Sequence, residues 1–166
     1  MKHYYDIFPT PVGDFAVALD DSGALVATAF GGLAELRDRF DAGELVRDSA
    51  HAAAVRREVG EYFAGKRLNF TVPLAAEGTT FQHRVWKELV SIPSGETRTY
   101  GQLAAKLGKP FASRAVGRAN ATNPICLLIP CHRVIGSDGS LTGFAFGEDI
   151  KRQLLEHEGA LSAAVA

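Results

Sequence analysis

The sequence predicts an α/β N-terminal domain over residues 1–77, followed by a mostly α C-terminal domain over residues 78–166. Three observations predict this division. The first segment contains short apolar runs separated by turn-forming residues, and two helical patterns follow them. Pro73 and Gly78 then mark an extended and looped stretch of the kind that joins domains. From Thr79 onward, helical patterns interrupted by glycine and proline predominate.

The first domain opens with strand patterns rich in aromatic and aliphatic side chains. They lie at residues 4–8, 14–20 and 24–30. The stretches 9–13 and 20–23 between them have the proline, glycine and aspartate typical of turns. Helical patterns follow at 33–40 and 51–64, and Gly65 closes the second. We therefore expect a small antiparallel sheet with helices.

The second domain is expected to begin with a helix that Thr79 and Thr80 cap and that Pro93 ends. An apolar stripe runs along this helix at Phe81, Val85, Leu89 and Ile92. A short helix from residue 99 to 107 and another over 112–121 follow, separated by a glycine and a proline. Two short helices joined in this way predict a helix-turn-helix, whose second helix normally lies against DNA.

Composition and charge exclude several classes of protein. Two cysteines are too few for a disulfide framework, and no apolar run approaches the ~20 residues that span a bilayer. The chain opens with no signal-like segment, so we expect an intracellular protein without membrane contact, cytoplasmic or, in a eukaryotic host, nuclear. The net charge is −1, yet residues 79–133 carry eight basic side chains against Glu88 and Glu96. Such a basic stretch fits a limited anionic partner.

The segment from Asn123 to Gly136 carries the chemistry. Its apolar residues 125–129 are expected to form a buried strand that Pro130 stops, so that the chain turns where Cys131 lies. A nearby imidazole lowers the pKa of a thiol, but neighbouring strand side chains face opposite ways, so His132 can help only if the turn brings it round. A cysteine beside an apolar run is also often a small buried hydrophobic residue. The residue types alone leave both interpretations open.

The second cysteine is expected to have only a packing role. Cys126 lies inside the apolar run, and an extended strand would place it roughly 16 Å from Cys131 on the opposite face. That separation argues against a disulfide between the two. No spaced set of cysteines and histidines indicates a metal site.

The motif Pro130-Cys-His-Arg-Val134 resembles the active-site signature of the O6-alkylguanine-DNA alkyltransferases, also called methylated-DNA–protein-cysteine methyltransferases. The resemblance runs from Phe81 to Gly159. Its other segments are Phe81-Gln-His-Arg-Val-Trp86, Ile92-Pro-Ser-Gly-Glu-Thr97, Tyr100-Gly-Gln-Leu-Ala104, Arg114-Ala-Val-Gly117, Asn123-Pro124, Gly136-Ser-Asp-Gly-Ser-Leu-Thr-Gly143 and Leu154-Leu-Glu-His-Glu-Gly159. The first domain resembles the smaller, RNase H-like domain of this family only in outline.

The resemblance implies one irreversible transfer of an alkyl group from O6 of a flipped-out guanine, or from O4-alkylthymine, to Cys131. No cofactor and no metal is implied. His132 is implied to take the thiol proton through a water, and Glu158 to orient His132. Asn123 is implied to brace the active-site turn, and Tyr100 to help protonate the departing guanine.

The resemblance also implies a monomer bound in the minor groove of double-stranded DNA that contains O6-alkylguanine. Arg114 is implied to enter the base stack and fill the gap that the flipped nucleotide leaves. Positions implied to contact or approach the DNA backbone are Gln82, Gly101, Lys109 and Ser137.

The implied substrate pocket includes Val134, Phe144, Ala145 and Phe146. Many relatives have tyrosine at the position of Phe144 and a small residue at that of Phe146. Phenylalanine at 144 lacks the phenol hydroxyl of tyrosine, so one polar contact is lost. The bulk of Phe146 predicts a narrow pocket that prefers methyl to benzyl-sized groups.

Three other functions are weighed against alkyl transfer. An alkyltransferase-like protein binds damage without removing it, but such relatives replace the cysteine that stands here at Cys131. A transcription regulator would use the helix-turn-helix, yet bifunctional relatives carry an additional cysteine-rich metal domain that these 166 residues lack. A Cys-His hydrolase would turn over repeatedly.

Overall fold

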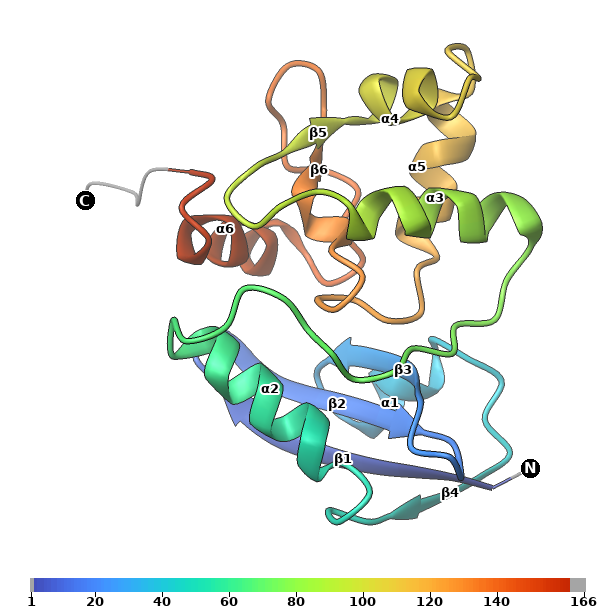
Figure 1. Ribbon diagram of the computed structural model, residues 1–166, viewed down its shortest axis with the longest axis vertical. Coiled ribbons are helices and arrows are strands. Elements are labelled where there is room, and N and C mark those ends of the chain that lie inside the picture. The colour runs from blue at the N-terminus through green and yellow to red at the C-terminus, as the bar shows by residue number, and fades with distance from the viewer. Residues whose placement is uncertain (1, 162–166) are drawn as a thin grey trace. The chain divides into compact units, whose positions relative to one another are not determined.

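Figure 1 shows the computed structural model, which describes residues 2–161. These residues form two compact units. The first ends at Glu77 and also takes in Pro124–Cys126, while the second comprises Gly78–Asn123 and resumes at Leu127. A three-residue segment of the later chain therefore belongs to the core of the earlier unit.

The first unit is built on a four-stranded sheet. Its strands are β1 (Lys2–Thr10), β2 (Gly13–Leu19), β3 (Leu25–Phe30) and β4 (Glu44–Arg47), in the order β3-β2-β1-β4. β1, β2 and β3, the three predicted strands, pair antiparallel as expected. The fourth strand, β4, was not predicted and pairs parallel with β1, so the sheet is mixed rather than wholly antiparallel. β4 escapes sequence analysis because it is a four-residue strand whose two central side chains are only half-buried.

Two helices cover this sheet. α1 (Leu33–Arg37) packs against β2 and β3, and α2 (Ala53–Phe63) packs against β1, where Figure 1 shows it crossing in front of the strands. Burial is almost continuous along β2 and β3, as expected of strands covered on both faces. At their centre the rings of Phe15 and Phe30 lie 4.8 Å apart. The helices are shorter than predicted, and Gly65 (φ +76°) follows α2.

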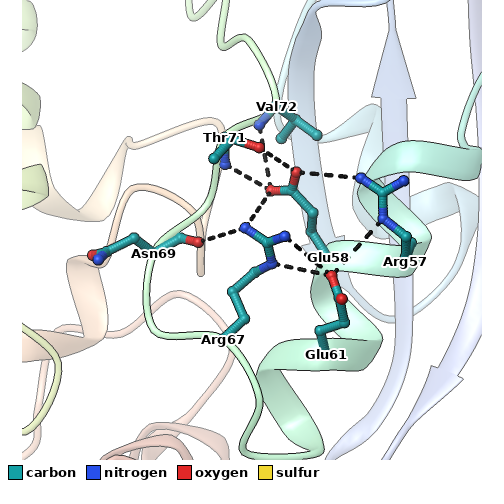
Figure 2. A network of polar contacts seen from close by, with 7 residues as sticks. All are labelled: Arg57, Glu58, Glu61, Arg67, Asn69, Thr71 and Val72. Atoms are coloured by element: carbon teal, nitrogen blue, oxygen red, sulfur yellow. Dashed lines mark hydrogen bonds and ion pairs between the residues drawn. The ribbon is translucent and has the colours of Figure 1, made fainter.

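The segment after α2 is fastened to it by Glu58, which is 1% exposed. Figure 2 shows this carboxylate accepting hydrogen bonds from the amide and hydroxyl of Thr71 at 2.7 and 2.6 Å and from the amide of Val72 at 3.3 Å. Arg67 lies 3.8 Å away. Burial raises the pKa of Glu58, but these hydrogen bonds and Arg67 outweigh it and lower the pKa.

The second unit is mostly helical, as predicted. It contains α3 (Thr80–Val90), α4 (Tyr100–Lys106), α5 (Ser113–Ala121) and α6 (Glu148–His157), together with the short parallel pair β5 (Arg98–Thr99) and β6 (Val134–Ile135). Both α3 and α4 pack against α5. Thr79 and Thr99 cap α3 and α4 in reciprocal hydrogen bonds with Gln82 and Gln102.

The apolar run before the cysteine is not the strand that was predicted. Ile125 forms a single bridge with Thr28, and the chain then turns at Leu127, whose φ is +74°. The run is buried in a turn rather than in a ladder, and burial alone cannot distinguish the two. The separation of roughly 16 Å between the cysteines assumed an extended strand, so it does not apply. Neither cysteine is part of a disulfide, and both are buried.

No helix among residues 2–161 is both long and apolar enough to cross a membrane.

Candidate active site

Cys131 opens the 3-10 turn η1 (Cys131–Arg133) and is 5% exposed. Its amide donates to the carbonyl of Ile129 at 2.7 Å, and the amide of Arg133 donates to that of Pro130 at 3.0 Å. Pro130 has no amide hydrogen to satisfy and therefore suits the position just before this turn. The chain turns at Cys131 as predicted, and backbone hydrogen bonds fix the thiol in place.

Two buried asparagines brace the backbone on either side of this turn. Asn123 Nδ2 donates to the carbonyl of Ile129 at 2.9 Å, and Asn120 Nδ2 donates to that of Cys131 at 3.3 Å. Sequence analysis selected Asn123 but missed Asn120. A signal was available, because Asn120 falls at helical spacing on the same face of α5 as the apolar Val116.

A buried ion-pair cluster follows the cysteine. His132 Nε2 lies 2.9 Å from Glu158 Oε2, and Arg133 donates to both oxygens of the same carboxylate at 2.8 and 2.9 Å. Burial raises the pKa of Glu158, but hydrogen bonds from His132 and Arg133 outweigh it and hold the pKa well below its usual range. An ionised carboxylate can only accept hydrogen bonds, so Nε2 of His132 carries the proton.

The other ring nitrogen of His132 is therefore unprotonated. Burial lowers the pKa of this imidazole more than Glu158 raises it, which keeps the ring neutral at neutral pH. Nδ1 is buried and has no hydrogen-bond partner within the described chain. A neutral nitrogen with an available lone pair, on the residue next to a buried thiol, has what a general base requires.

Two further polar side chains face the cysteine. Lys151 is fully buried, and Nζ donates to the carbonyls of Val134 and Thr142. Burial lowers the pKa of Lys151 to about 8, against the opposing effect of negative charge at Cys131. Tyr100 donates its hydroxyl to the Thr142 carbonyl at 3.1 Å, and burial and Cys131 both raise its pKa. Tyr100 therefore remains a proton donor at neutral pH.

Sequence analysis missed Lys151 and gave no role to Arg133. The buried Leu154 and Leu155 lie three and four residues after Lys151, and Glu158 lies seven residues after it. Charged residues on an otherwise apolar helix face are the signal that could have identified Lys151. Arg133 stands in the quoted motif, but no local pattern predicts its partner 25 residues away.

The loop between β6 and α6 approaches Tyr100 closely. Gly143 has φ +89°, and a Cβ atom there would lie 2.5 Å from the Tyr100 hydroxyl, so only glycine fits. Of the predicted pocket residues, Val134 and Phe144 are buried, Phe146 is half-buried and Ala145 is exposed. The rings of Phe144 and Phe146 meet edge to face, with centroids 5.6 Å apart.

The predicted DNA contacts lie outside this cluster. Arg114 is exposed in the first turn of α5, and no hydrogen bond or ion pair from the described residues holds its guanidinium. Gln82 caps α3 and donates to the Thr122 hydroxyl at 3.1 Å. Lys109 lies over the Phe81 ring, 5.9 Å from its centroid. Gly101 in α4 and Ser137 after β6 are exposed.

Comparison with known proteins identifies the family. Residues 80–160 match the DNA binding domain of 6-O-methylguanine DNA methyltransferase, and residues 3–76 match its ribonuclease-like domain. The chain belongs to the methylated-DNA–protein-cysteine methyltransferase family. One member, from Methanosarcina acetivorans, is 46% identical over 159 residues, which are 95% of this chain and 99% of the relative.

Solved structures of the family agree with this assignment. The Mycobacterium tuberculosis OGT in complex with DNA matches with a TM-score of 0.84 and 39% identity, over 95% of this chain and 93% of that one. The O6-methylguanine-DNA methyltransferase from Pyrococcus kodakaraensis matches with a TM-score of 0.65 and 26% identity, over 95% and 99%. Within residues 2–161, no group of three or more side chains is arranged to hold a metal ion.

Proposed function

We propose that this chain repairs DNA by direct reversal, taking the alkyl group of O6-alkylguanine onto Cys131 once and irreversibly. One observation carries the proposal. The buried carboxylate of Glu158 fixes the proton of His132 on Nε2 and leaves Nδ1 buried without a partner in the described chain, on the residue that follows Cys131. This is the arrangement of nucleophile, base and orienting group that activates a cysteine.

The transfer proceeds as one displacement at the alkyl carbon. The thiol proton of Cys131 passes through a water to His132 Nδ1, and the thiolate forms a bond from sulfur to the alkyl carbon. The bond from that carbon to O6 breaks, and its electron pair leaves with the guanine. Tyr100 gives this base a proton and regains one from His132 through solvent. The products are a neutral guanine and a thioether, which water does not readily cleave.

The surrounding charges favour the transition state of this reaction. The Lys151 ammonium is protonated below about pH 8 and attracts negative charge at Cys131. The raised pKa of Tyr100 keeps its hydroxyl protonated until the leaving base needs the proton. Asn120 and Asn123 hold the turn, so the sulfur need not reorganise during the reaction.

DNA binding is assigned to the α4–α5 pair acting as a helix-turn-helix. The relative from Mycobacterium tuberculosis is described in complex with DNA, and the basic, unpaired Arg114 opens α5 here. The damaged base must leave the duplex to reach a buried thiol, so we assign base flipping with Arg114 filling the gap. We further propose minor-groove binding, action on O4-alkylthymine, a monomeric state, a cytoplasmic or nuclear location and an RNase H-like first domain.

A duplex carrying methyl-labelled O6-methylguanine tests the reaction. We expect label to reach the protein in a 1:1 ratio and to stay there, whereas Cys131→Ser should take up none. Cys126→Ser is the matched control and should react normally. Release of label into solution would indicate a hydrolase instead, and binding without transfer would indicate a damage-recognition protein.

The loop between β6 and α6, which carries Phe144 and Phe146, sets the range of alkyl groups in this proposal. Phe146 packs edge to face on the buried Phe144, and we propose that its bulk narrows the alkyl pocket. We expect methyl transfer to be faster than benzyl transfer. Phe146→Gly should raise the rate of benzyl transfer roughly tenfold, because the size of an apolar pocket discriminates between substrates by about this factor. Equal single-turnover rates of the unaltered protein on duplexes with O6-methylguanine and with O6-benzylguanine would contradict this.

A further inference from the structure

Phe111 is the most exposed large hydrophobic residue in the described chain, at 101% of its reference surface. The next such residues, Leu68 and Val90, are 64% and 54% exposed. Phe111 lies in the turn between α4 and α5, one residue before the N-cap of α5. Its ring contributes nothing to the folded core, so packing within the unit does not account for it.

The stretch of sequence that contains Phe111 is basic. The chain carries no aspartate or glutamate between Glu96 and Asp138. Within that stretch, four exposed cations lie on α4, the turn and α5: Lys106, Lys109, Arg114 and Arg118. A second copy of this chain would bring the same positive charges against each other, which disfavours a protein dimer at this surface. A polyanion complements the surface.

We propose that Phe111 is an apolar wedge that packs into the minor groove of DNA beside the point where Arg114 enters. The inference rests on the proposed function, since it specifies how the α4–α5 pair grips the duplex. Phe111 lies one residue before the N-cap of α5 and Arg114 lies in its first turn, so both belong to the N-terminal end of this helix. Cations bind phosphates without unstacking bases, whereas an inserted aromatic ring opens a base step and bends the duplex. Phe111 therefore lowers the free energy needed to flip the damaged base.

Tryptophan substitution reports directly on the position of the ring. The chain has one tryptophan, Trp86, which is buried and donates its indole N–H to the Ala119 carbonyl. In Phe111→Trp the additional emission should be quenched by an undamaged duplex and protected from acrylamide, because the indole stacks on bases. Val90→Trp on α3 is the matched control, and its emission should not change. Unchanged emission from Phe111→Trp in the bound complex would overturn the proposal.

Alanine substitution measures the size of the effect. We expect Phe111→Ala to weaken binding of an undamaged duplex by roughly 5- to 100-fold. The dependence of affinity on salt should stay the same, because no phosphate contact is lost, whereas Arg118→Ala should reduce it. If Phe111→Ala binds as tightly as the unaltered protein, the wedge is wrong. If the unaltered protein does not bind DNA, the proposed function fails instead.

Discussion

Each of the two units contains one buried glutamate, and the two differ in what they hold. Glu58 is 1% exposed and accepts mainly from backbone amides and a hydroxyl, so it fastens one segment of chain to α2 (Figure 2). The Glu158 side chain is fully buried and accepts from a histidine ring and a guanidinium. Both carboxyls have lowered pKa values, so neither burial nor titration distinguishes them.

The distinction lies in the partners. The two backbone amides and the hydroxyl that donate to Glu58 have no second group that could exchange a proton in a reaction. His132 has a second nitrogen beyond its bond to Glu158, and that nitrogen lies buried without a partner in the described chain. A buried carboxylate thus indicates catalysis when its partner can still exchange a proton. Substitutions at these positions test this difference.

The largest expected effect is on chemistry at Glu158. In Glu158→Gln the neutral amide no longer requires the proton on Nε2 of His132, so Nδ1 stops being the base. We expect single-turnover methyl transfer to slow by roughly 10²- to 10⁴-fold. Glu158→Asp keeps the charge and should recover part of the rate. Equal rates for the two variants, measured on folded protein, would remove Glu158 from its orienting role.

Lys151 adds a buried charge that lacks a carboxylate within ion-pair distance among the described residues. Its pKa of about 8 in the folded protein lies below the ordinary 10.5, so the unfolded chain binds more protons between these values. The free energy of unfolding should therefore rise with pH across that window, by at most about 3 kcal/mol. Urea unfolding at pH 8, 9 and 10 should show no such rise in Lys151→Met, and the same rise in both proteins would contradict the assignment.

The smallest expected effect is on stability at Glu58. Glu58→Gln weakens several hydrogen bonds to a buried charge, and we expect a loss of about 2 kcal/mol in the free energy of unfolding. Because the folded pKa is lowered, this contribution is present above the ordinary pKa of 4.5 and is lost as pH falls below it. Urea unfolding at pH 7 and pH 4 measures the loss. Methyl transfer should be unchanged, and a slowed reaction in folded protein would erase the contrast with Glu158.

Local patterns in the sequence predicted helices, and most precisely where α3 and α4 begin. Thr79 and Thr99 begin α3 and α4 through hydrogen bonds to residues three positions away, so neighbouring sequence contains all the information needed. The resemblance to the family selected Cys131, His132 and Glu158 as candidate site residues.

The tertiary structure alone decided what depends on distant contacts. β4 is a strand because β1 pairs with it, and residues 125–129 are buried in a turn at Leu127 rather than in a strand. Glu158 and Arg133 meet across 25 positions, and Lys151 reaches the Val134 carbonyl across 17. Hydrophobic spacing specifies which face of an element is buried but not which groups meet there. The sequence therefore selected the candidate reacting residues, and packing decided which charges surround them.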